Sequence, residues 1–265
     1  MHTTRSIAIE AALEAGRVIR GHLGTLDGVD YKGEIDIVTA ADHAAEEAVL
    51  NSLWGAFPDF GILAEESGAQ AATNGSSSRW VVDPLDGTTN FATANPHFAV
   101  SIALERDDRV VLGVIYDPML DELFIAERGR GATVNGKRLA VSRIDVFLQA
   151  MLSTGFPYDV NKRSENLEMF TYFTHLTRAV RRVGAAALDL CYVAAGRYDG
   201  FWEAGLKPWD SAAGSLVVLE AGGMVTDYQG QEFTIQGPNI VASNGLIHDE
   251  LLDGLQRQAG RAGAR

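Results

Sequence analysis

The stretch Trp80-Val-Val-Asp-Pro-Leu-Asp-Gly-Thr-Thr-Asn-Phe91 places two carboxylates, Asp83 and Asp86, directly after a short apolar run. That run predicts a buried strand, and the proline and glycine that follow predict a sharp change of direction at its end. Two acids this close would repel each other strongly in a buried place if both were ionised. A divalent cation relieves that repulsion, and oxygen donors favour Mg²⁺ or Mn²⁺ over Zn²⁺. The carbonyl of Leu85 is a further possible oxygen ligand.

These acids also have a purely structural interpretation. An Asp-x-x-Asp pair by itself fits equally well a turn at a strand end in which one aspartate caps the next helix. Glu65 and Glu66 follow the apolar run 62–64, and adjacent glutamates are usually solvated. Asp210 opens an apolar helical segment, where aspartate is most often a cap. The residues alone leave both interpretations open.

The apolar pattern outward from this stretch changes repeatedly between the periods of a helix and a strand. Helices are predicted over residues 3–23, 40–56, 164–178, 185–196, 208–222 and 247–257. Strands are predicted over 62–64, 80–82, 99–104, 110–116, 122–126, 148–154, 199–204, 223–228 and 239–242, with a surface loop at 69–79 and a connection at 181–184. The order predicts an α/β protein, with an α+β N-terminal lobe (1–145) and an α/β C-terminal lobe (146–265) that form one catalytic unit.

Composition narrows the classes of function. The chain has 35 acidic and 22 basic residues, a formal net charge of −13, which disfavours direct binding to nucleic acid. Its one cysteine, Cys191, lies in an apolar run and is expected to be buried rather than catalytic. No apolar stretch is long enough to span a membrane, and the start lacks a signal-peptide pattern. A cytoplasmic location is therefore expected.

Several segments together resemble the inositol monophosphatase family. Residues 83–91 resemble the family's first signature, and residues 209–214 followed by 220–223 resemble its second. Further matches at 36–42, 64–67 and 182–189 extend the resemblance over nearly the whole chain in the expected order. It implies a layered αβαβα sandwich of the inositol monophosphatase and fructose-1,6-bisphosphatase type.

The resemblance also implies roles for single residues around a site for two or three Mg²⁺ ions, with Mn²⁺ as a possible substitute. The matching metal ligands are Glu65, Asp83, the carbonyl of Leu85, Asp86 and Asp210. The catalytic set is Asp42, Thr88, Glu65 and Glu66, in which Thr88 and Asp42 match the pair that orients and deprotonates the attacking water. Asp42 also has capping-box spacing from Thr39, so it is expected to serve both purposes.

The expected substrate contacts come from both lobes: Asp86, Gly87, Thr88, Gly184, Ala185, Ala186, Glu203 and Asp210. Backbone amides at a helix start near Gly87 would receive phosphate oxygens. Many relatives carry Ser or Thr at the position of Ala185, so a hydroxyl is missing from the pocket. Lys207 either attracts an anionic substrate or is an ordinary surface lysine. Lys32 resembles a loop lysine near the metals, although its spacing to Asp36 is one residue short.

The predicted function is Mg²⁺-dependent hydrolysis of a small phosphate monoester, above all myo-inositol monophosphate, by metal-activated water. Fructose 1,6-bisphosphate, histidinol phosphate and a 3′-phosphonucleotide are alternative substrates. The alternative from another class is a regulatory protein-binding role with a retained phosphatase site, since some bacterial relatives act in transcription complexes. The resemblance further implies inhibition by Li⁺ and a homodimer.

Overall fold

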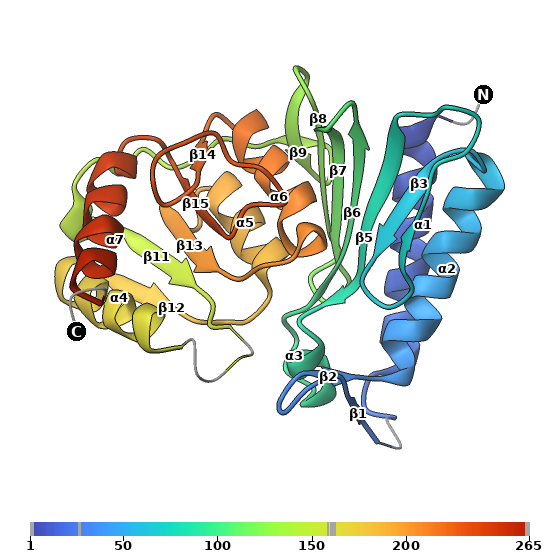
Figure 1. Ribbon diagram of the computed structural model, residues 1–265, viewed down its shortest axis with the longest axis horizontal. Coiled ribbons are helices and arrows are strands. Elements are labelled where there is room, and N and C mark those ends of the chain that lie inside the picture. Colours follow the sequence, from blue (N-terminus) through green and yellow to red (C-terminus); the bar gives the residue numbers. More distant parts are fainter. Residues whose placement is uncertain (1–2, 26–27, 158, 160–162, 263–265) are drawn as a thin grey trace.

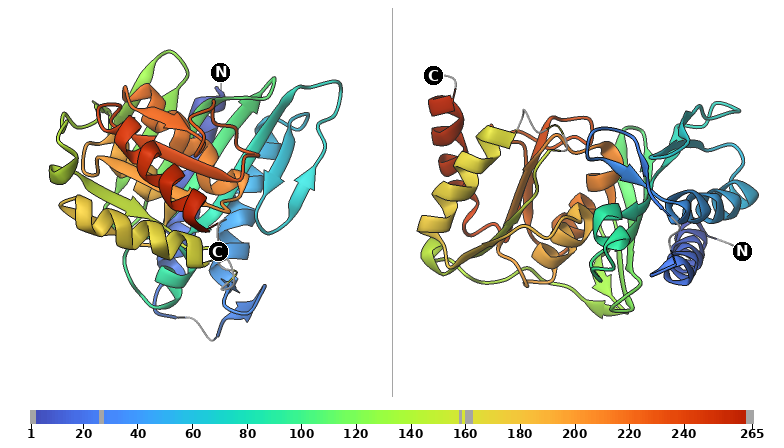
Figure 2. Two further views of the ribbon diagram at one scale, coloured as in Figure 1. Left: turned by 60° about the vertical axis from the view of Figure 1, so that its left-hand side comes forward. Right: turned by 90° about the horizontal axis from the view of Figure 1, so that it is seen from below.

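Helical and sheet layers alternate in the computed structural model, in the order helix, sheet, helix, sheet, helix (Figure 1). The structure describes residues 3–25, 28–157, 159 and 163–262. The layers are built from α1 (Thr4–His22) and α2 (Ala40–Ala56), then α5 (Ala186–Ala194) and α6 (Pro208–Glu220), then α4 (Arg163–Leu176) and α7 (His248–Ala262), with one sheet between each pair. The right-hand view of Figure 2 shows the same order. The predicted αβαβα sandwich is confirmed.

The larger sheet has eight strands in the order β10-β9-β8-β7-β6-β5-β3-β4. Its strands are β3 (Gly61–Ala64), β4 (Gly68–Gln70), β5 (Ser78–Asp86), β6 (Ala99–Arg106), β7 (Arg109–Asp117), β8 (Glu122–Glu127), β9 (Gly131–Val134) and β10 (Lys137–Arg138). All neighbours are antiparallel except β3 and β5. Asp107 and Asp108 both have positive φ in the tight turn between β6 and β7, and the Asn135-Gly136 pair, also with positive φ, joins β9 to β10.

The smaller sheet has five strands in the order β12-β11-β13-β15-β14. These are β12 (Ala179–Arg181), β11 (Met151–Thr154), β13 (Gly200–Ala204), β15 (Asn239–Ser243) and β14 (Met224–Thr226). β11 pairs in parallel with β12 and β13, and the remaining pairs are antiparallel. Residues 139–150 connect the two sheets, and we place the boundary of the proposed lobes 1–145 and 146–265 there.

Several local predictions are wrong, mostly where elements are very short. β4 overlaps the start of the predicted loop 69–79, and β12 overlaps the predicted connection at 181–184. The first residues of the predicted strand 148–154 belong to a 3₁₀ turn, η1 (Phe147–Gln149), and a hairpin of β1 (Asp30–Tyr31) and β2 (Ile37–Val38) was not predicted. Two or three residues are too few to show a period, so their backbone pairing is set by the neighbouring strand.

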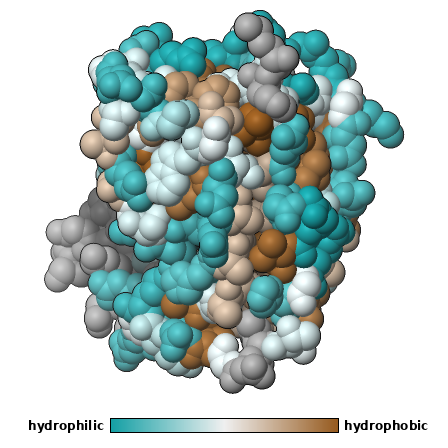
Figure 3. All heavy atoms as spheres, turned by 90° about the vertical axis from the view of Figure 1, so that its right-hand side faces the viewer, coloured by the Kyte–Doolittle hydropathy of each residue, from teal (hydrophilic) through white to brown (hydrophobic). Residues whose placement is uncertain are grey.

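The outermost layer approaches its neighbours through small side chains. α1 is capped by Thr3 and buries Ile7, Ala8, Ala11, Ala12, Ala15, Gly16 and Ile19. Gly16 lies so close to Tyr116 that an added Cβ would be 2.5 Å from its ring. The opposite face, seen in Figure 3, mixes hydrophilic and hydrophobic side chains. Within the described part of the chain, no helix is long and apolar enough to cross a membrane.

The middle helices share an apolar core with the larger sheet, and one close contact there gives a stability prediction. A Cβ added at Gly113 of β7 would lie 2.8 Å from the carbonyl oxygen of Ala213 in α6. That oxygen belongs to the backbone, so we expect Gly113→Ala to lower the free energy of unfolding by about 1–3 kcal/mol. Urea denaturation would measure the loss. Gly55→Ala is the control, because open space surrounds Gly55 in a helix; equal stability of both variants would contradict the prediction.

Candidate active site

The acidic part of the segment 80–91 lies on a bulged end of β5. The register with β6 pairs Asp83 with Ser101 and Asp86 with Ala99, so β5 carries one extra residue between the two acids. Pro84 occupies this interval and has no N–H for the sheet. Leu85 donates its N–H to Asp83 Oδ1 at 3.0 Å instead. The prediction that the strand ends before Asp83 is therefore wrong, because the strand continues through the bulge to Asp86.

Asp86 connects the larger sheet to a middle-layer helix. Its Oδ2 accepts a hydrogen bond of 2.7 Å from the N–H of Ala187, in the first turn of α5. Burial raises the pKa of Asp86 to about 7, although the amides at this helix start favour its charged form. The carboxylate thus caps α5, and the same group faces the cavity described below. The structural and the functional interpretations of this acid are compatible.

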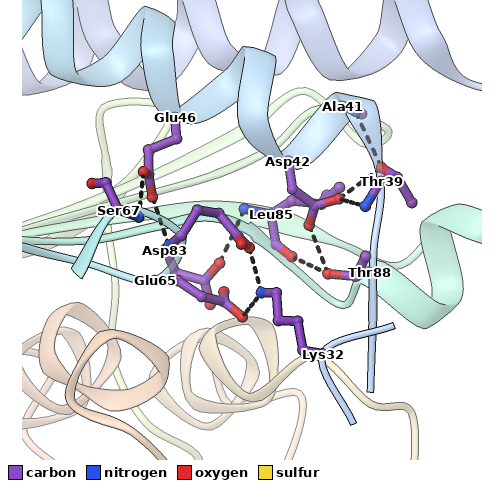
Figure 4. Close-up of polar contacts among 11 residues, drawn as sticks. Lys32, Thr39, Ala41, Asp42, Glu46, Glu65, Ser67, Asp83, Leu85 and Thr88 are labelled. Carbon is purple, nitrogen blue, oxygen red and sulfur yellow. Dashed lines mark hydrogen bonds and ion pairs between the residues drawn. The ribbon is translucent and has the colours of Figure 1, made fainter. Parts of the chain in front are cut away.

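Asp42, at the start of α2, joins a helix cap to Thr88 (Figure 4). Its Oδ2 accepts from the N–H of Thr39 at 2.8 Å and from the Thr39 hydroxyl at 2.6 Å, which confirms the predicted capping box. Its Oδ1 accepts from the hydroxyl of Thr88 at 2.9 Å. Burial raises the pKa of Asp42, while these hydrogen bonds favour its charged form. One carboxylate therefore caps α2 and accepts from Thr88, while its predicted action on water stays a prediction.

Thr88 has a choice of acceptors. Its hydroxyl lies 2.9 Å from Asp42 Oδ1 and 3.1 Å from the carbonyl oxygen of Leu85. A hydroxyl has a single hydrogen, so it donates to one of them at a time. When the Thr88 hydroxyl donates to Asp42, its lone pairs can accept from a water molecule. The carbonyl oxygen of Leu85 then receives no hydrogen bond from Thr88.

Gly87 precedes the short helix α3 (Thr88–Ala92) and has a φ of 92°, a left-handed conformation that favours glycine. A Cβ there would lie 3.0 Å from the carbonyl oxygen of His97 and 3.3 Å from the Cβ of Ala185. The loop that begins α3 is thus pressed against the start of α5. This close approach brings the predicted phosphate loop next to the predicted substrate contact Ala185.

Lys32 of the β1–β2 hairpin reaches the predicted glutamates. Its Nζ lies 2.9 Å from Glu65 Oε1 and also donates to Glu66 Oε1 (Figure 4). Burial opposes the charged ammonium, but the two carboxylates outweigh it and raise the pKa of Lys32 well above its usual value. The short spacing to Asp36 therefore does not keep this lysine from the acidic site.

The acids of the site influence one another strongly. Burial raises the pKa of Asp83 well above its usual value, and the neighbouring charges of Glu65, Asp86 and Asp210 add to it. Asp210 behaves as the structural interpretation expected, since its Oδ2 accepts from the N–H of Lys207 at 2.7 Å and caps α6. Its pKa is also raised well above normal, by burial and by Asp86 and Glu65. A cation among these carboxylates would relieve both causes.

The donor set fits a hard divalent cation, although it is not assembled around one point. Among the described residues, no three acidic, histidine or cysteine side chains form a ready metal-binding group. Glu65 is instead turned to the ammonium of Lys32. Every predicted donor is an oxygen atom, as Mg²⁺, Mn²⁺ and Ca²⁺ prefer.

A cavity of about 260 Å³ collects the predicted substrate contacts from both lobes. Its walls include six of them: Asp86, Gly184, Ala185, Ala186, Glu203 and Asp210. Burial raises the pKa of Glu203 well above its usual value, with the charges of Asp189 and Asp210 adding to it. Its carboxylate packs directly on Gly155, where an added Cβ would overlap it. The exposed Lys207 lines a neighbouring cavity of about 190 Å³ together with Lys32, so its two interpretations remain open.

Other contributors were not singled out by the sequence. Arg163, Arg182 and Phe156 line this cavity and also a separate one of about 350 Å³. The side-chain amide of Asn90 donates to the carbonyl oxygens of His97 at 2.8 Å and Val183 at 3.0 Å, tying α3 to the segment before α5. Asn90 lies in the segment 83–91 and Arg182 in the segment 182–189, and only the family resemblance of these segments could have indicated a role for them. Arg163 and Phe156 have no comparable signal in the sequence.

Comparison with known proteins gives a consistent result. The model of the inositol monophosphatase family matches residues 1–261. The Nus factor SuhB of Escherichia coli is 44% identical over 97% of this chain and its own full length. The inositol-1-monophosphatase of Mesorhizobium japonicum is 43% identical over 95% of this chain and 96% of its own. The crystal structure of the extragenic suppressor protein suhB from Bartonella henselae superposes with a TM-score of 0.90 at 45% identity, covering 95% of this chain and 97% of that one.

Proposed function

The chain belongs to the inositol monophosphatase family, and from this premise we propose that it hydrolyses myo-inositol monophosphate to inositol and phosphate in a Mg²⁺-dependent reaction. One observation carries the proposal. The Asp42–Thr88 hydrogen bond lies beside mutually repelling carboxylates, and Asp86 and Asp210 of that group open on a cavity that also contains Glu203. A water-orienting pair, oxygen donors for a hard cation and a polar pocket are what metal-assisted phosphate hydrolysis requires.

Glu65, Asp83, the carbonyl of Leu85, Asp86 and Asp210 would hold two or three Mg²⁺ ions, with Mn²⁺ as a substitute. Bound metal would supply a water of lowered pKa and stabilise the negative charge that develops on the phosphate and the leaving oxygen. Asp42 and Thr88 perform the proton transfer. The water gives a proton to Thr88 Oγ1 as the Thr88 hydroxyl passes its own proton to Asp42 Oδ1, 2.9 Å away. Amides around Gly87 would receive phosphate oxygens.

Glu203 is proposed to bind hydroxyl groups of the leaving alcohol. We expect Glu203→Ala to raise KM for inositol 1-phosphate about tenfold or more, because a hydrogen bond to a charged or strongly polar group is lost. Phenyl phosphate has no ring hydroxyls and is the control substrate, for which KM should stay within about twofold. Steady-state phosphate release measures both. Equal losses for the two substrates would show that Glu203 supports the fold rather than the alcohol.

The substrate itself is tested by a panel. Phosphate release is compared for inositol 1-phosphate, fructose 1,6-bisphosphate, histidinol phosphate and a 3′-phosphonucleotide, with and without Mg²⁺. We expect the highest kcat/KM for inositol 1-phosphate, no turnover without metal, and inhibition by Li⁺. A higher kcat/KM for another member of the panel would contradict inositol phosphate as the substrate and would leave the proposed metal-dependent hydrolysis standing.

A second candidate function comes from the names of relatives. The proteins called Nus factor SuhB cover the chain as fully as the inositol-1-monophosphatase does, at the same level of identity. A regulatory protein-binding role is therefore the alternative, with protein rather than nucleic acid as the direct partner, given a net charge of −13. Affinity capture with and without Mg²⁺ tests it, and sedimentation at two concentrations tests the proposed homodimer. A cytoplasmic location remains a prediction.

A further inference from the structure

We infer that Glu46 is a positioning residue: it fixes the turn that presents Glu65 and Glu66 to the acidic site. Its Oε2 accepts a hydrogen bond of 2.9 Å from the N–H of Glu66, and its Oε1 accepts one of 2.8 Å from the N–H of Ser67 (Figure 4). The side chain is almost completely buried, with 4% of its surface exposed. The inference concerns the same site as the proposed function and rests on it.

The turn is held from two sides. Residues 65–67 connect β3 to β4, whose register pairs Ala64 with Gly68. The N–H of Glu65 donates to the carbonyl oxygen of Val82 in β5 at 3.1 Å, and the next two N–H groups donate to Glu46. Three consecutive amides are thus occupied, so the backbone from which the Glu65 side chain projects has one fixed direction.

The chemistry of Glu46 separates this role from that of a ligand. A buried carboxylate is costly unless hydrogen bonds compensate it, and both of its oxygens accept from backbone N–H groups. Those bonds direct the Glu46 carboxylate at the backbone of the turn. Glu46 therefore acts through Glu65, and its own contact with substrate is not required.

Helix α2 carries both the acceptor of the Thr88 hydrogen bond and the side chain that holds the Glu65 turn. Asp42 and Glu46 are four residues apart, so they lie on one face of the helix. Asp42 accepts from Thr88, and one turn later Glu46 holds the Glu65 turn. The helix thereby sets the distance between the proton-accepting pair and a predicted metal ligand.

Glu46→Gln tests the inference because it keeps the size of the side chain and replaces one acceptor oxygen by an NH₂ donor. We expect the Kd for Mg²⁺, measured by calorimetry without substrate, to rise about tenfold or more, as for other residues that orient metal ligands. We also expect faster amide exchange at Glu66 and Ser67. The kcat at saturating Mg²⁺ should recover to within a few fold, while a lost catalytic group would not recover.

The matched control is Glu47→Gln, which changes the neighbouring, exposed glutamate on the same helix. Glu46→Asp keeps the charge and is expected to give an intermediate Kd; it decides the question if the glutamine variant does not fold. An unchanged Kd for Mg²⁺ in a folded Glu46 variant overturns this inference and leaves the proposed function standing. Failure of the unmodified protein to bind Mg²⁺ overturns the proposed function together with it.

Discussion

Asp86→Asn is expected to lower Mg²⁺-dependent phosphate release by about a thousandfold or more while the fold survives. The substitution removes the negative charge that the site offers a cation. It retains a carbonyl oxygen that can accept from the N–H of Ala187, so the cap on α5 is kept. Phosphate release over a Mg²⁺ titration measures the first effect, and thermal denaturation measures the second.

Asp86→Ala separates the two roles of this residue. It removes both the charge and the cap, so we expect the same loss of turnover with an additional loss of about 0.5–2 kcal/mol in the free energy of unfolding. Turnover equal to that of the unmodified protein in Asp86→Asn would refute the proposed mechanism. Equal stability of the two variants would instead show that α5 does not depend on the cap.

The sequence predicted the helices and longer strands because each has enough residues to show its period. It also predicted the acids that the structure brings together, because Asp83, Asp86 and Asp210 all lie inside long motifs, with Asp86 at the end of β5 and Asp210 in the first turn of α6. The bulge in β5 was missed, since strand length there depends on pairing with β6 rather than on the apolar run. The same holds for β1, β2, β4 and β12, whose strand pairing comes from their neighbours.

The supporting residues of the site were harder to predict than its acids. Glu46 lies within a helix where a glutamate has no distinctive sequence signal, and its buried position follows only from the packing of α2 against the larger sheet. Lys32 could be assigned by resemblance but not by spacing, because the β1–β2 hairpin sets its reach. Such residues depend on contacts between distant segments, and a single sequence does not contain those distances.

Thr88→Ala and Asp42→Asn are each expected to lower kcat by about 10²–10⁴-fold, because general base catalysis contributes on that scale. The asparagine can still accept from the N–H of Thr39, and its amide group then faces Thr88 as a donor. The Thr88 hydroxyl would turn to the carbonyl of Leu85, the acceptor 3.1 Å away, and proton transfer to residue 42 would cease. Burst and steady-state phosphate release measure the chemical step, and Thr88→Ser, which keeps the hydroxyl, is the control.

The double variant that combines Thr88→Ala with Asp42→Asn shows whether the two residues act as one proton relay or contribute separately to kcat. If Thr88 passes the proton of the water to Asp42, removing either residue removes the whole path, so the double variant should be no slower than the worse single variant. Independent roles would multiply the two losses instead. Helix α2 should remain capped in Thr88→Ala, because Thr39 still bonds Asp42 Oδ2 through both its N–H and its hydroxyl. Multiplicative losses in folded variants would therefore assign Asp42 a structural role and leave Thr88 to orient the water alone.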